Sequence, residues 1–174
     1  MPVEVRSPLA GRAGDLAGVA REVEALAQVD VRVDPALASV GLPLEPNTWV
    51  ANGHRETLWL GPDEWLIVGP PDTEGSISKD LERALAGLPH SVVEVSAARA
   101  ILEVESAVRL DLLPQGCGID VHPRSWREGM CAQTLLARVP VILQEREAST
   151  RIFVRPSFAN YLVDWFLQVV NVRT

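Results

Sequence analysis

The sequence has little of what several classes of function require. It has no run of basic residues, and 16 Lys and Arg against 23 Asp and Glu give a net charge of −7. Because an acidic chain repels a phosphate backbone, nucleic-acid binding is not expected. No apolar run approaches the roughly 20 residues of a membrane-spanning helix, and residues 1–15 lack the apolar core of a secretory signal. We therefore expect a cytoplasmic chain without a membrane partner.

Motifs for cofactors and metals are also missing. There is neither a G-x-G-x-x-G fingerprint nor a Walker loop, so no bound nucleotide is predicted. Cys117, His122 and Cys131 share one stretch, but a fourth ligand and the close cysteine pair of structural zinc sites are absent. The two cysteines are expected to be reduced thiols. A nucleophilic Cys131 with His122 or His90 as its base is the weaker reading, because no helix N-terminus stands beside it to lower its pKa.

Paired carboxylates are present, and they raise the question of acid–base chemistry. Asp63 and Glu64 lie in a predicted turn, while Glu103 and Glu105 fall on one face of a predicted strand. Catalysis of this kind needs two carboxylates in unlike environments, which neither pair offers. A solvated turn and a solvated sheet face are the preferred interpretations.

Apolar periodicity predicts an α+β fold with antiparallel sheets and packed helices, because most of the predicted strands are joined by short hairpin-type turns. The length suggests a single domain over residues 1–174. Helices are predicted within residues 14–29, from Ser76 to Leu88, from Ser106 to residues 114–116, and over 157–170, with Ser76 and Ser157 as caps. Strands are predicted within residues 28–33, 57–60, 65–68, 91–95, 99–105, 131–137, 139–143 and 151–155.

Two features suggest a surface that contacts another protein. The apolar side of the last predicted helix is wider than the stripe of about 100° that packing on one core requires. Trp126 lies between arginines in a polar stretch, an environment more typical of an interface than of a core. Burial of the last helix within its own domain is an equally good reading. The candidate contact residues are Trp126, Phe158, Trp165 and Phe166.

Several stretches, taken together and in order, resemble the γ subunit of heterotetrameric sarcosine oxidase. The most specific are LGPDEWL, the H-P-R…G-x-C-A-Q-T-L pattern that begins at His122, and SFANYLVDW. The resemblance covers nearly the whole chain. The matching segments are residues 7–10, 42–48, 58–68, 93–104, 116–143 and 155–166.

The resemblance implies a function that composition does not show. Such an enzyme oxidatively demethylates sarcosine to glycine and passes the one-carbon unit to tetrahydrofolate. It has α, β, γ and δ subunits, and FAD, covalent FMN and NAD belong to the larger ones. The γ subunit is similar in fold to the folate-binding domain of aminomethyltransferases. It is expected to hold no redox cofactor, no metal and no catalytic residue, and to act in assembly of the complex.

A stand-alone folate-binding or aminomethyl-transferring protein is the alternative. It would need a carboxylate to bind the pterin, for which Glu94, Glu103 and Glu105 are candidates. However, Glu94, Ala98 and Ala100 stand where members of the family commonly have Asp, Asn and Thr, which weakens the case for folate binding. These departures also leave open which secondary amine the complex oxidises.

Overall fold

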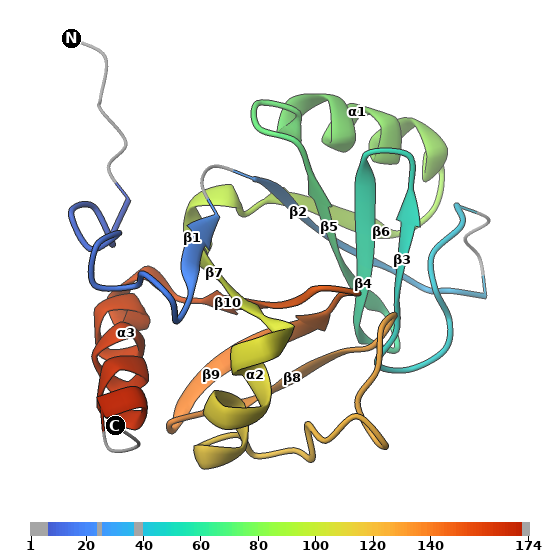
Figure 1. The fold of residues 1–174 in the computed structure, drawn as a ribbon. Coiled ribbons are helices and arrows are strands. Elements are labelled where there is room, and N and C mark those ends of the chain that lie inside the picture. Colours follow the sequence, from blue (N-terminus) through green and yellow to red (C-terminus); the bar gives the residue numbers. More distant parts are fainter. Residues whose placement is uncertain (1–6, 24–25, 37–39, 172–174) are drawn as a thin grey trace, which may run out of the picture. The chain divides into compact units, whose positions relative to one another are not determined.

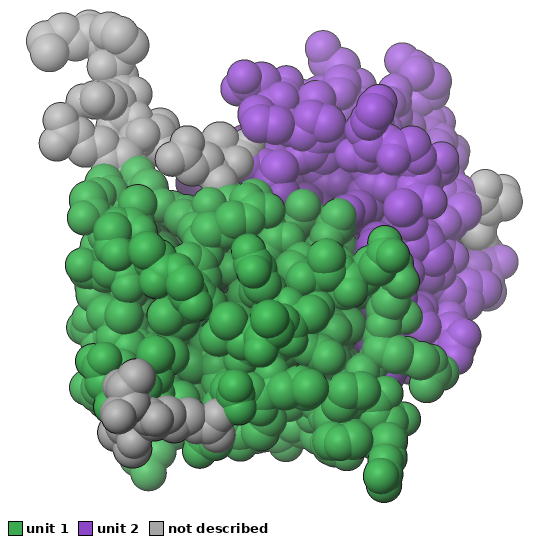
Figure 2. All heavy atoms as spheres, viewed as in Figure 1, with its two compact units in different colours: residues 1–24, 98–128, 133–174 green, residues 25–97, 129–132 purple. Residues whose placement is uncertain are grey.

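The computed structural model describes residues 7–23, 26–36 and 40–171. These residues divide into two compact units, shown in different colours in Figure 2. Unit 1 comprises described residues within 1–24, 98–128 and 133–174, and unit 2 those within 25–97 and 129–132. Two five-stranded antiparallel sheets and a few helices make up the fold, which confirms the α+β class (Figure 1). The single domain stays a prediction.

One sheet lies in unit 1 apart from Cys131 and Ala132, and its strand order is β1-β7-β10-β9-β8. Its centre is apolar, because β7 and β10 are paired in a register that sets Leu102 opposite Ile152, and both side chains are buried. The β8–β9 hairpin turns through Ala137 and Arg138, both with positive φ. The strands are β1 Arg21–Val23, β7 Ala100–Glu105, β8 Cys131–Leu136, β9 Val139–Glu145 and β10 Ser149–Val154.

The sheet of unit 2 has the order β3-β4-β5-β2-β6, with helix α1 (Glu74–Ala84) against β2, β5 and β6. In its core, alternate residues of β2 and β5 pack against the apolar side of α1, where Ile77 and Leu81 are buried. The predicted turn after Gly61 is confirmed, since Gly61 pairs with Glu64. The strands are β2 Ala27–Val33, β3 Trp49–Asn52, β4 Arg55–Gly61, β5 Glu64–Gly69 and β6 His90–Glu94.

The helix predicted within residues 14–29 is wrong. Residues 8–19 form successive turns, Gly18 has a φ of 78°, and the chain enters β1 at Arg21. Glycine costs about 1 kcal/mol in a helix interior, and a positive φ ends the helical hydrogen bonding. Leu16 and Val19 are buried as predicted, but from turns, and Val23 pairs with Ile101 in the sheet.

The remaining helices lie close to their predicted positions. Helix α2 (Ser106–Leu112) is extended by the 3₁₀ turn Leu113–Gln115, and a second 3₁₀ turn, Ser96–Ala98, separates β6 from β7. Helix α3 is Pro156–Asn171. Both predicted caps are wrong: α1 begins before Ser76, and α3 begins before Ser157.

One side of α3 is bonded to the segment that precedes β1. Arg12 donates to Asp164 at 2.7 Å and to Asn160 at 3.3 Å, and Asn160 donates to the carbonyl of Pro8 at 3.0 Å. The opposite side, with Leu162, Val163 and Phe166, is buried in unit 1. Phe158 and Tyr161 are exposed and belong to neither side, so the core of unit 1 accounts for only part of the wide apolar arc.

Candidate functional site

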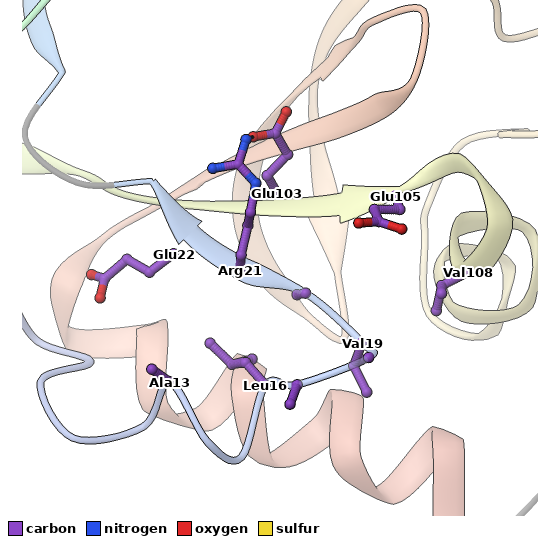
Figure 3. A pocket seen from close by; sticks show the side chains of 11 residues that line it. Ala13, Leu16, Val19, Arg21, Glu22, Glu103, Glu105 and Val108 are labelled. Carbon is purple, nitrogen blue, oxygen red and sulfur yellow. Dashed lines mark hydrogen bonds and ion pairs between the residues drawn. The ribbon is translucent and has the colours of Figure 1, made fainter.

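A cavity of about 390 Å³ in unit 1 is the first place to look for a ligand site (Figure 3). Its wall is formed by the turns before β1, by β1 and β7, and by α2. Leu16, Val19 and Val108 give the wall an apolar part. The ionisable groups are Arg21, Glu22, Glu103 and Glu105. A cavity of this size is in the range of small-molecule pockets.

The carboxylates of this cavity are mostly engaged within the chain. Glu103 is buried, it forms an ion pair with Arg21, and it accepts the hydroxyl of Ser149 at 2.5 Å. The pair follows from the register, because Arg21 lies opposite Glu103 across β1 and β7. Figure 3 shows Arg21 reaching Glu103, and Glu22, which accepts the Ser7 hydroxyl, pointing elsewhere. The expectation that Glu103 lies on a solvated sheet face is wrong.

The three alternative candidates for the carboxylate that binds a pterin have different environments. Glu103 and Glu105 line the same cavity, whereas Glu94 is exposed on β6 in unit 2. Because both oxygens of Glu103 are engaged, Glu105 is left as an exposed group at the margin. A pterin contact therefore stays a prediction, and we derive no chemistry through tetrahydrofolate in this chain.

Trp126 belongs to a second buried polar cluster in unit 1. Its indole nitrogen donates to Glu145 at 2.8 Å, and the Thr150 hydroxyl donates to the same carboxylate oxygen at 2.5 Å. The other oxygen of Glu145 pairs with Arg109, and both charged side chains are buried. Only 3% of Trp126 is exposed, so the expectation of a surface tryptophan is wrong. Trp126 is thus buried with an acceptor for its indole, although its sequence neighbours Arg124, Ser125 and Arg127 are exposed. A subunit contact of this loop stays a prediction.

The three candidates on α3 have different environments. Phe166 is fully buried in unit 1, and its ring centroid lies 5.7 Å from that of Trp165. Trp165 is half-buried, and Phe158 is 38% exposed. Sequence reasoning missed Tyr161, which is 50% exposed and lies between Phe158 and Trp165. Its helical spacing from both residues was the available signal. A contact of any of them with another subunit stays a prediction.

The thiols are free, and neither has the environment of a nucleophile. Cys131 is buried, and its Sγ donates to the carbonyls of Thr48 at 3.1 Å and Trp59 at 3.4 Å. Burial raises the pKa of Cys131 to about 12. Burial also raises the pKa of Cys117, which is half-buried. Within the described ranges, no three His, Cys, Asp or Glu side chains form a group that could hold a metal ion.

Cys131 is therefore expected to resist alkylation in the folded chain. A pKa of about 12, raised from 9.0, lowers the thiolate fraction about a thousandfold at pH 8. Iodoacetamide labelling, read residue by residue by mass spectrometry, should be slow at Cys131 until urea unfolds the chain. Equal rates with and without urea would contradict the burial.

The same pKa shift predicts a pH dependence. Because the Cys131 thiol loses its proton at a lower pH in the unfolded chain than in the folded chain, the free energy of unfolding should fall as pH rises from about 9 towards 12.

No described helix is long and apolar enough to cross a membrane.

Comparison with known structures first defines the class of fold. The glycine cleavage system aminomethyltransferase T of Bartonella henselae superposes over 92% of this chain and 49% of its own, with a TM-score of 0.60 and 13% identity. That likeness shows an aminomethyltransferase-like fold and nothing about activity.

Closer relatives define the family. The sarcosine oxidase, gamma subunit family matches residues 27–171. Sarcosine oxidase subunit gamma of Corynebacterium sp. (strain P-1) is 35% identical over 87% of this chain and 79% of its own, and that of Arthrobacter sp. is 36% identical over 91% and 83%. A chain of the heterotetrameric sarcosine oxidase from Corynebacterium sp. U-96, solved with pyrrole 2-carboxylate, has a TM-score of 0.86 at 30% identity, covering 97% of this chain and 95% of its own. The chain belongs to the sarcosine oxidase gamma subunit family.

Proposed function

We propose that this chain acts as the non-catalytic γ subunit of a heterotetrameric sarcosine oxidase, in assembly of a complex with α, β and δ subunits. The complex would oxidatively demethylate sarcosine to glycine in the cytoplasm and pass the one-carbon unit to tetrahydrofolate. FAD, FMN, NAD and tetrahydrofolate would be bound by the partner subunits. The observation that carries the proposal is the 35% identity to a sarcosine oxidase subunit gamma over 87% of the chain.

The internal chemistry supports a role without catalysis. The carboxylate with the most buried position in the cavity, Glu103, is held by Arg21 and Ser149, and Cys131 stays protonated at neutral pH. Groups in these states neither transfer protons nor attack a substrate readily. The stand-alone folate-binding alternative has less support, because Glu103, the buried candidate for its carboxylate, is already bonded to Arg21 and Ser149.

Co-purification from the native host tests the assembly role. A tagged chain should bring down a yellow complex far heavier than 19.0 kDa that consumes oxygen when sarcosine is added. A colourless monomer or homo-oligomer would contradict the proposal.

Glu105→Gln in the same complex tests the non-catalytic role, because losing a general acid or base costs about 10² to 10⁴ in rate. We expect turnover within about twofold of the wild type, and a hundredfold loss with intact assembly would make the chain catalytic.

A further inference from the structure

Three aromatic side chains form a continuous stripe on the outside of α3. Phe158, Tyr161 and Trp165 are spaced by three and four residues, which places them within about 60° of one another around the helix axis. Phe158 and Tyr161 are exposed, and Trp165 is half-buried. We call these three residues the aromatic face. It lies between the buried side of α3, which includes Phe166, and the side bonded to Arg12.

Two of the three aromatic side chains contact other parts of unit 1. The Tyr161 hydroxyl donates to the carbonyl of Ala137 in the β8–β9 turn at 3.1 Å. The Trp165 ring lies against Gly116, where a Cβ would approach it to 2.8 Å. Rigid aromatic side chains lose little entropy on binding, and Trp and Tyr are enriched among the residues that dominate interface energies.

Two arginines adjoin the aromatic face, although the chain is acidic overall. Arg155 immediately precedes α3, and its carbonyl accepts from the amide of Phe158 at 2.9 Å. Arg138 follows Ala137 in the turn that binds Tyr161. Both arginines are exposed. The single acidic residue of α3, Asp164, is neutralised by Arg12 on the other side of the helix.

We infer that the aromatic face docks onto another subunit of the heterotetramer, at an apolar patch bordered by carboxylates. The apolar centre fits the three rings, and the acidic border fits Arg138 and Arg155. This inference rests on the proposed function, which supplies the partner. A second copy of this chain is the competing occupant, but a symmetric contact would place two sets of these arginines at one interface without the acidic border that they fit.

Phe158→Glu tests the aromatic face, and Val93→Glu is its matched control. Val93 is 49% exposed on β6 in unit 2, so the same charge is introduced at similar exposure. The measurement is the flavin absorbance that co-purifies with equal amounts of tagged chain. We expect at least about a tenfold loss for Phe158→Glu and no change beyond about twofold for Val93→Glu. Circular dichroism of both isolated variants checks that they remain folded.

The outcomes separate the inference from the proposed function. If the wild-type chain brings down no flavin protein, the proposed function fails. If the wild type does so and Phe158→Glu does so equally, the aromatic face is not the docking surface. If the wild type is a dimer alone and Phe158→Glu converts it to a monomer without reducing flavin recovery, the face joins two copies and the inference is overturned.

The basic border has its own test. Arg138→Glu and Arg155→Glu should each reduce the rate of association with the partner. The dependence of that rate on salt should also fall, because charges at the rim of an interface act mainly on the encounter of the two proteins. Arg127→Glu, at an exposed arginine before β8, should leave both unchanged. Equal effects of the three substitutions would show only the influence of net charge and would overturn the acidic-border assignment.

Discussion

Replacing Arg109 by methionine is expected to destabilise the chain by about 3–5 kcal/mol, since removing one partner leaves the other charge buried and uncompensated. In unit 1, Arg109 and Glu145 are both buried and form an ion pair. Trp126 and Thr150 would still donate to Glu145. Two neutral donors do not replace a cation, so the carboxylate would remain a buried charge.

The expected loss can be measured as a shift in the urea midpoint of the purified chain. Arg127→Met removes an exposed arginine with the same change in net charge. It should lower the free energy of unfolding by no more than about 0.5 kcal/mol. Equal shifts for the two variants would mean that net charge, and not the buried pair, determines the effect. Adding Glu145→Gln to Arg109→Met should restore part of the loss, because the amide oxygen can still accept from Trp126.

The same cluster shows why Trp126 could not be placed from its neighbours. Local polarity indicates exposure only if the polar residues surround the side chain in space. Here the acceptor, Glu145, lies 19 residues further along at the end of β9. Such long-range partners are invisible to periodicity. The buried Glu103 was misjudged for the same reason, because Arg21 and Ser149 reach it from β1 and β10.

Elements with strong local signals were predicted well. The β4–β5 hairpin combines two apolar runs with proline at a turn position that its φ favours, and α3 has a long apolar repeat. The segment before β1 has apolar residues at helical spacing too, but it is interrupted by glycines. There the competing signal, a positive φ available to Gly18, was decisive. The β8–β9 turn has no such signal, since Ala137 and Arg138 adopt positive φ without glycine or asparagine.

The second large effect is expected at Phe166, and it separates the two apolar sides of α3. Phe166→Ala removes a fully buried ring and should cost about 3–5 kcal/mol of stability. Phe158→Ala removes a ring that is 38% exposed and should cost about 1 kcal/mol or less. The matched pair makes the same chemical change eight residues apart on one helix, so helix propensity is equal and only the environment differs.

Two measurements give the pair opposite rankings. Urea unfolding of the purified chain should rank Phe166→Ala as far more damaging. Flavin recovery with the tagged chain, at a temperature where both variants are folded, should rank Phe158→Ala as more damaging, because only that ring belongs to the aromatic face. If Phe166→Ala lost flavin recovery while its unfolding midpoint stayed at the wild-type value, Phe166 would contact the partner directly, and the buried side of α3 would not be a core of unit 1. With that ranking observed, one side of α3 would serve its own core and another a partner, which would explain why its apolar arc exceeds the stripe that a single core requires.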